Sequence, residues 1–238
     1  MYVYGPVPSR RLGSSLGISL TPHKICNFDC IYCQLGRTTK KSSERKEFVS
    51  KQAILAELRQ WLHSHPQQAK QLHYITFSGT GEPTLHLAIG ALISEIKKIT
   101  DVPVAVITNA SLFSDPELRK ELLGADLLIP SLDAVQEDIF NRIDRPHPGI
   151  VLGSIIEGLI ALRKEFRGEI WLEVMLVKGV NDDLGHIRKL KEVIERIRPD
   201  KIQLNSPVRV PAEPDVFPVD SQRLAEIKAI LGAKCEVA

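Results

Sequence analysis

Three cysteines lie within one eight-residue segment near the amino end of the chain. Cys26, Cys30 and Cys33 form the segment CNFDCIYC, a C-x3-C-x2-C spacing directly after an expected strand. Three thiolates can hold three corners of a cubane iron–sulfur cluster and leave the fourth iron without a protein ligand. An incomplete protein shell leaves a position at which a substrate can bind the metal. The spacing therefore favours a metal centre with an open coordination site.

Two other uses of these thiols compete with the open cluster. His23 lies three residues before Cys26 and could complete a four-ligand structural zinc site. A disulfide would leave one of the clustered thiols unpaired. The remaining cysteine, Cys235, is expected to be a free thiol in a C-terminal tail. We expect the open cluster in preference to zinc or a disulfide.

The bulk properties of the chain are those of an ordinary globular protein. It has 238 residues, 43% of them apolar, and a formal charge of +2, which is too small for a strong nucleic-acid field. We expect one domain, because α/β barrels of roughly 200–250 residues commonly fold as a unit. Its expected parts are an entry segment at 1–15, a barrel core at 16–206 and a C-terminal extension with a helix at 207–238.

The sequence predicts neither a secretory signal nor a membrane span. The first residues, MYVYGPVPSRRLG, lack an apolar signal region, and no apolar run reaches the roughly 18 residues of a membrane helix. We therefore expect a cytoplasmic location and no membrane partner, and reduced thiols in that compartment suit thiolate ligation. The basic stretch 37–51 is expected to be a solvated loop, and RNA stays open as a partner.

Apolar runs typical of strands alternate along the chain with amphipathic helical patterns. This alternation implies parallel strands joined by right-handed crossovers, in an open α/β sheet or an incomplete barrel. The expected strands are Leu16–Leu20, Tyr74–Ser78, Val102–Thr108, Leu127–Ser131, Ile170–Val177 and Lys201–Asn205. The helical stripes lie at 54–62, 85–96, 155–162 and 184–197.

Polar residues at the carboxyl ends of the expected strands favour the barrel. Asn109 follows the third strand and Asp133 the fourth, and loops after parallel strands carry the chemistry of such barrels. Because side chains alternate across a strand, Gln203 and Asn205 share one face, which we expect to look inward. Glu173 stands in an otherwise apolar strand, where a carboxylate needs a partner or a ligand.

A second chemical signal is the turn SGTGEPTL, which directly follows the second expected strand. Gly79 and Gly81 allow positive φ or a close approach of backbone to a ligand, Glu82 offers a carboxylate and Pro83 fixes the exit into a helix. Such a turn could bind a cationic amino group. Read alone, it is equally a tight strand-to-helix connection.

Together, the cysteine loop and the Gly81-Glu82-Pro83 turn resemble the radical S-adenosylmethionine (SAM) superfamily. Tyr32, an aromatic residue directly before the last cysteine, adds to this resemblance. It implies a partial (β/α)6 barrel that holds a [4Fe–4S] cluster on the three cysteines, with SAM chelated at the open iron. A reduced cluster of this kind cleaves SAM to methionine and a 5′-deoxyadenosyl radical, and the cofactor supplies the reactivity.

The resemblance also implies roles for residues around the cluster. Glu82 and its neighbours would contact the SAM amino group, and Tyr32 would contact the adenine. By position at strand ends, Asn109, Ser131 and Asp133 would reach the SAM ribose and carboxylate. The cofactor-binding residues implied in this way are Tyr32, Gly79, Gly81, Glu82, Pro83, Asn109, Ser131 and Asp133.

Within the superfamily, the segments GPVPSRRLG, CNFDCIYCQLG and FSGTGEPTL are most similar to iron–sulfur oxidoreductases related to the wyosine-forming tRNA enzymes. Those enzymes use a second cluster. Beyond the three motif cysteines, this chain has only Cys235, which is too few for an ordinary second cluster. A tRNA base is one candidate substrate, and the expected reductant is a flavodoxin or a ferredoxin.

Basic and amide side chains after the later strands are candidates for substrate contact. Positive groups around the barrel mouth would suit an anionic substrate, although each taken singly is more often a surface ion-pair partner. Arg142, Arg145 and His147 lie in an expected loop, NRIDRPH. The candidates are Arg142, Arg145, His147, Glu173, Lys178, Asn205 and Arg209.

Two classes of function therefore follow from the sequence. The first is a radical SAM enzyme acting on an unidentified substrate. The second is a non-catalytic protein that binds an iron–sulfur cluster or zinc for structure or electron transfer. The incomplete thiol set and the acidic glycine turn on the adjacent strand favour the enzyme, because a structural zinc protein needs neither.

Overall fold

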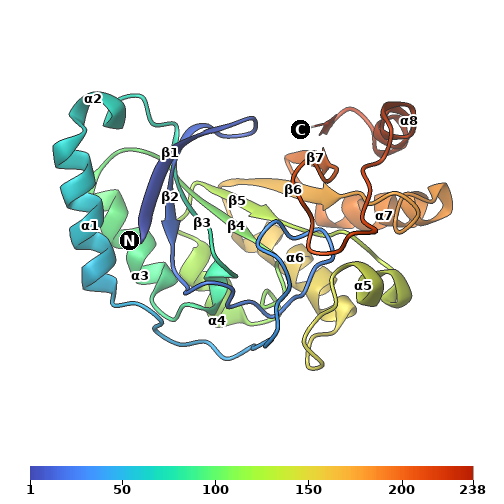
Figure 1. The fold of residues 1–238 in the computed structure, drawn as a ribbon, viewed down its shortest axis with the longest axis horizontal. Coiled ribbons are helices and arrows are strands. Elements are labelled where there is room, and N and C mark those ends of the chain that lie inside the picture. Colours follow the sequence, from blue (N-terminus) through green and yellow to red (C-terminus); the bar gives the residue numbers. More distant parts are fainter. Residues whose placement is uncertain (238) are drawn as a thin grey trace.

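Eight strands form one sheet in the computed structural model, which describes residues 1–237 (Figure 1). The strands lie in chain order from β1 to β8. β1 pairs antiparallel with β2, and every later neighbour pairs in parallel. The bounds are β1 Val3–Ser9, β2 Gly13–Ser19, β3 Tyr74–Ser78, β4 Val104–Thr108, β5 Leu127–Pro130, β6 Glu169–Met175, β7 Lys201–Asn205 and β8 Cys235–Val237.

Helices connect the parallel strands and cover one face of the sheet. The main hydrophobic core lies between that face and the helices, and it includes Phe77 of β3, Val106 of β4 and Leu190 of α7 (Leu184–Ile197). The helices are α1 Lys51–Ser64, α2 Pro66–Ala69, the 3-10 helix η1 Pro83–Leu85, α3 Ile89–Ile99, α4 Pro116–Leu122, α5 Glu137–Ile143, α6 Leu152–Glu165, α7 Leu184–Ile197 and α8 Ser221–Leu231.

Helix α7 shows how local sequence sets an element. Asp183 precedes the helix and accepts hydrogen bonds from the backbone N–H groups of Gly185 and His186, which satisfies donors that the helix itself leaves free. Its apolar stripe is buried and faces the sheet. The helix ends at Ile197, and the next residue, Arg198, adopts the left-handed conformation with φ of 57°.

A smaller core lies on the inner face of the sheet. Leu12, at the tip of the β1–β2 hairpin, packs there with Leu127 and Ile129 of β5. The rings of Tyr74 and Trp171 meet edge to face with centroids 6.4 Å apart. These side chains close the inner face near the amino ends of the strands and leave the carboxyl ends available for a site.

The six expected strands correspond to β2 through β7, and the α/β fold is confirmed. Two further strands were not expected. The entry segment forms β1, and Cys235 lies in β8, where it pairs with Ile202 and is buried. The expectation that Cys235 belongs to a tail was therefore wrong, because three residues are too few to show a strand period.

Two other local expectations also need correction. The stripe at 85–96 is divided between η1 and α3, which begins only at Ile89. The segment NRIDRPH is not wholly a loop, because its first three residues complete α5, which ends at Ile143. Gln136 begins this helix without a side-chain cap, so the sequence carries no clear start signal.

The chain after β7 crosses from the far part of the sheet to the cysteine loop, as Figure 1 shows in red beside the blue loop. The backbone N–H of Glu213 donates to the carbonyl of Ile31 at 3.1 Å. Arg145 Nη1 lies 2.5 Å from Glu213 Oε1. We call residues 206–219 the strap.

Among the described residues, no helix is long and apolar enough to span a membrane.

We predict that Leu12→Ala lowers the free energy of unfolding by about 2–5 kcal/mol, because it leaves a cavity in the inner core. Urea unfolding measures the change. Val7→Ala on the same hairpin is the control, since Val7 is 37% exposed and should change stability by less than about 0.5 kcal/mol. Equal losses in both variants would contradict a buried role for Leu12.

Candidate functional site

The cysteine loop follows β2 and lies against the chain that leaves α5. The backbone N–H of Asp29 donates to the carbonyl of Asp144 at 3.0 Å, and Ile31 N–H donates to the carbonyl of Ile143 at 3.0 Å. His147 N–H donates to the carbonyl of Asn27 at 2.7 Å. These bonds fix the backbone that carries the thiols, as a preorganised ligand set requires.

Each of the three thiols has a polar neighbour. Lys24 Nζ donates to Cys33 Sγ at 2.8 Å, and the Phe28 backbone N–H donates to Cys26 Sγ at 3.4 Å. Cys30 Sγ donates to Asp144 Oδ1 at 3.3 Å. N–H groups aimed at sulfur stabilise thiolate ligands and tune a cluster. The donor set of three thiols on one loop therefore fits an iron–sulfur cluster.

Burial changes the acidity of two of these thiols. It raises the pKa of Cys26 to about 12, with the nearby Glu82 carboxylate adding to the effect. Burial also raises the pKa of Cys30, and Asp144 adds to that shift. Metal binding must therefore displace protons from the metal-free protein.

The described residues 1–237 contain no group of three or more His, Cys, Asp or Glu side chains arranged around a single ion. His23 is exposed and does not complete a four-ligand set with the thiols. A cubane cluster has a different requirement, because its cysteines bind different iron atoms. The described residues therefore do not form the four-ligand set that a structural zinc site with His23 would need.

The glycine turn after β3 is docked onto the cysteine loop. Gly81 pairs in parallel with Ile25, and Glu82 N–H donates to the carbonyl of Ile25 at 2.9 Å. A Cβ at Gly81 would overlap the Ile25 carbonyl oxygen and lie 2.6 Å from Thr21 Oγ1. Gly81 is therefore needed for contact with the protein's own backbone, whereas Gly79 supplies a positive φ of 103°.

Glu82 lies under this contact and is 3% exposed. Its Oε1 accepts from Thr108 Oγ1 at 2.6 Å and from Thr84 N at 3.0 Å, and its Oε2 accepts from Asn109 N at 2.8 Å. Burial raises the Glu82 pKa, and these hydrogen bonds oppose the rise. A carboxylate oxygen can accept more than one hydrogen bond, so Oε2 retains capacity for a ligand.

Asn109 connects the end of β4 to the cysteine loop. Its Nδ2 donates to Asn27 Oδ1 at 2.7 Å and lies 3.7 Å from Cys26 Sγ. Asn27 in turn donates to Ser111 Oγ at 2.7 Å and is fully buried. Paired amides of this kind fix both loops, because each buried polar group finds its partner within the network.

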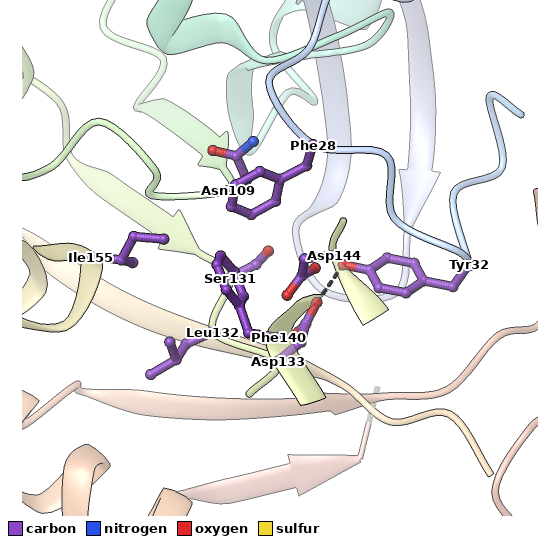
Figure 2. Close-up of a pocket in the computed structure, with 9 residues that line it drawn as sticks. All are labelled: Phe28, Tyr32, Asn109, Ser131, Leu132, Asp133, Phe140, Asp144 and Ile155. Atoms are coloured by element: carbon purple, nitrogen blue, oxygen red, sulfur yellow. Dashed lines mark hydrogen bonds between the residues drawn. The ribbon is translucent and has the colours of Figure 1, made fainter. Parts of the chain in front are cut away.

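A small cavity lies beside the cysteine loop, and Figure 2 shows the residues that line it. Figure 2 shows the Tyr32 hydroxyl donating to Asp133 Oδ2, with Asp144 nearby. The cavity lining is Phe28, Tyr32, Asn109, Ser131, Leu132, Asp133, Phe140, Asp144 and Ile155.

The two acids of the cavity form a buried pair. Asp133 Oδ1 accepts from Met175 N at 2.7 Å, and Asp144 Oδ1 accepts from Cys30 Sγ at 3.3 Å. Burial raises the pKa of Asp133 to about 7, and it also raises the pKa of Asp144, with Asp133 adding to that shift. Two neighbouring carboxyl groups cannot both ionise freely in such surroundings.

The structure brings most of the expected cofactor residues together. The three cysteines, Gly81, Glu82 and Asn109 meet around the cysteine loop, and Tyr32, Ser131 and Asp133 line the cavity. Pro83 occupies the first position of η1 and fixes the exit from the turn.

The expected substrate residues are more scattered. Arg142 and Lys178 are exposed, and Arg209 is exposed and donates to Gln34. Arg145 is committed to Glu213 and Asp29. His147 binds the cysteine loop through its backbone, and Glu173 has a partner in Arg11. Asn205 is buried on the inner face of β7.

Several residues at the site were not singled out from the sequence. Asp144, Lys24 and Asn27 all contact the thiols or their loop. Asn27 and Lys24 stand inside or beside the cysteine segment, so proximity in sequence could have marked them. Asp144 lies 114 residues from Cys30, and only the fold brings it there.

Comparisons with known proteins agree with this geometry. The family model described as the radical SAM superfamily matches residues 20–190. The solved structure of TYW1 with a lysine–pyruvate adduct bound is similar in fold, with a TM-score of 0.68 and 22% identity, over 91% of this chain and 72% of that chain.

Sequence relatives extend over nearly the whole chain. A UPF0026 protein of Methanocaldococcus jannaschii is 38% identical over 95% of this chain and 70% of its own length. A protein of Brachyspira hyodysenteriae described as GTPase Obg is 41% identical over 99% of this chain, and the chain spans 34% of that protein. The chain belongs to the radical SAM superfamily, whose members are enzymes that use SAM and an iron–sulfur cluster.

We predict that Gly81→Ala separates the turn from the cysteine loop, because the added methyl group overlaps the Ile25 carbonyl. The unfolding midpoint and the iron content after reconstitution should both fall. Gly153→Ala in α6 is the matched control, since a methyl group added there would enter open space and alanine favours helix by about 1 kcal/mol. An iron content unchanged in Gly81→Ala would contradict the docking role.

We predict that the metal-free chain loses free energy of unfolding as the pH rises from about 4 to about 7. The folded state favours protonated Asp133, whose pKa is raised to about 7. Protonation of Asp133 therefore contributes its full stabilisation below the ordinary carboxyl pKa, and this contribution is lost as the pH rises through the raised pKa. Asp133→Asn should flatten the slope in urea unfolding at several pH values. Parallel slopes for both proteins would show that the pair does not titrate in this range.

Proposed function

We propose that Cys26, Cys30 and Cys33 hold a [4Fe–4S] cluster and that SAM binds at its open iron and in the adjoining cavity. The observation that carries this proposal is the docking of the three-thiol loop onto the Glu82 turn through Ile25 and Gly81. When bound and reduced, the cluster would supply one electron for cleavage of SAM to methionine and a 5′-deoxyadenosyl radical. The substrate of that radical is unidentified, and a tRNA base is one candidate.

The chain's own residues would orient SAM and exclude water. Glu82 Oε2 can accept from the SAM amino group while it holds Asn109 N–H. Tyr32 would pack against the adenine, with its ring fixed by the hydrogen bond to Asp133. Asn109, Ser131 and Asp133 would contact the ribose and carboxylate from the strand ends. Gly79, Gly81 and Pro83 would shape the turn, and a fixed geometry of this kind lowers the entropic part of the barrier.

We also propose that the chain forms one domain with the parts expected from the sequence, at 1–15, 16–206 and 207–238. The contact of the strap with Ile31 supports this, since it joins the C-terminal part to the cysteine loop. A cytoplasmic location would keep the thiols reduced. A flavodoxin or ferredoxin would serve as the external reductant.

Reconstitution with iron and sulfide in the absence of oxygen tests the proposal. We expect wild-type protein treated with dithionite and SAM to form 5′-deoxyadenosine, measured by liquid chromatography and mass spectrometry. Cys30→Ala should lower the yield at least a hundredfold, because it removes a cluster ligand. Cys235→Ala is the matched control, since this thiol lies in β8 away from the loop, and it should retain the activity.

The same experiment separates the enzyme from a non-catalytic metal protein. A wild-type chain that binds iron or zinc tightly but forms no 5′-deoxyadenosine on reduction would refute the enzyme and favour the structural role. A tRNA substrate would further require that tRNA affinity fall steeply with salt, which a filter-binding titration at several salt concentrations measures.

A further inference from the structure

Two buried amide side chains on β7 have polar atoms without a partner. Gln203 is 3% exposed and Asn205 is 7% exposed. Within the described residues, Gln203 Oε1 and Asn205 Nδ2 have no hydrogen-bond partner. Unpaired buried polar atoms destabilise a fold, and a native protein retains them where water or a ligand completes the bond.

These amides lie on the inner face of the sheet. In the register of β6 and β7, Glu173 is opposite Gln203 and Met175 is opposite Asn205. The intervening Ile202 and Leu204 belong to the main core on the other face, so alternation directs Gln203 and Asn205 inward. We call Glu173, Gln203 and Asn205 the inner-face site.

The inner-face site adjoins residues that line the cofactor cavity. Asp133 lines the cavity and accepts a hydrogen bond from the backbone of Met175, which is the register partner of Asn205. Ser131, another cavity residue, pairs with Glu173. A molecule held by the two amides would therefore lie beside the group that occupies the cavity.

Two charged residues of β6 and β7, Glu173 and Lys201, are already paired. Glu173 forms an ion pair with Arg11, whose side chain is 23% exposed, and Lys201 lies 3.1 Å from Glu236. The exposed basic residues Arg142 and Lys178 lie on other elements. The amides, rather than a net charge, would therefore select the ligand.

We propose that the inner-face site binds the substrate of the radical reaction and recognises an uncharged edge with an N–H donor beside a carbonyl acceptor. Nucleobases and carboxamides share this edge. Its N–H would donate to Gln203 Oε1, and its carbonyl would accept from Asn205 Nδ2. The two residues lie about 7 Å apart along the strand. A carboxylate or phosphate offers acceptors only and would leave Gln203 Oε1 unpaired. This inference rests on the proposed function.

Stability measurements on the full chain provide the first test. Gln203→Leu and Asn205→Leu should leave the thermal midpoint unchanged or raise it, because each removes an unpaired buried polar atom. Asn181→Leu is the matched control, because Asn181 is fully buried and bonds Val177 N and the carbonyls of Asp133 and Met175. Its midpoint should fall by about 5 °C or more. Equal falls at positions 203 and 205 would overturn the proposal and indicate structural water.

Calorimetric binding to the reconstituted chain provides the second test, with uridine, nicotinamide and nicotinate as probes. We expect saturable binding of uridine or nicotinamide, weakened about tenfold by Gln203→Leu, and no binding of nicotinate. Uridine alone would identify a nucleobase site, and nicotinamide alone a carboxamide site.

Equal binding of nicotinate, or no binding of either uncharged probe, would overturn the proposal. Formation of 5′-deoxyadenosine by the wild type is scored separately. Its absence would refute the proposed radical chemistry, whereas its presence without probe binding would refute only the inner-face site.

Discussion

The structure of the site depends on one backbone contact, the pairing of Ile25 with Gly81. Through it the cysteine loop after β2 rests on the turn after β3, and Glu82 N–H completes the contact at 2.9 Å from the Ile25 carbonyl. The thiols and the Glu82 carboxylate are thereby held near one another, close enough for Glu82 to raise the pKa of Cys26. Only a residue without a side chain permits this approach.

A second set of contacts holds the other side of the cysteine loop. The chain after α5 bonds the backbone of Asp29 and Ile31, and the strap adds Glu213. Arg145 lies between Asp29 and Glu213 and pairs with both. Segments from the middle and the end of the chain therefore hold the loop by hydrogen bonds and ion pairs. Its geometry depends on the whole fold rather than on the loop sequence.

The site and the inner face both contain groups that work against stability. Asp133 and Asp144 are buried together, and Gln203 and Asn205 retain unpaired atoms. An apolar core lies under the helices, and helices such as α7 start with a side-chain cap. Local violations of this kind are expected where function has been favoured over stability. Here Asp133 and Asp144 line the cavity, and Asn205 is the register partner of Met175, whose backbone bonds Asp133.

The sequence by itself determined the thiol spacing, the acidic glycine turn and the six parallel strands, because each is written in contiguous residues with a clear period or motif. It predicted that Glu173 needs a partner but not that Arg11 supplies it. It missed the contact of Asp144 with Cys30 and the strand that contains Cys235. It also missed that position 81 requires glycine because of its contact with the Ile25 carbonyl. Only the tertiary structure decided these, because each depends on a contact between segments that are far apart in the chain and carry no shared local pattern.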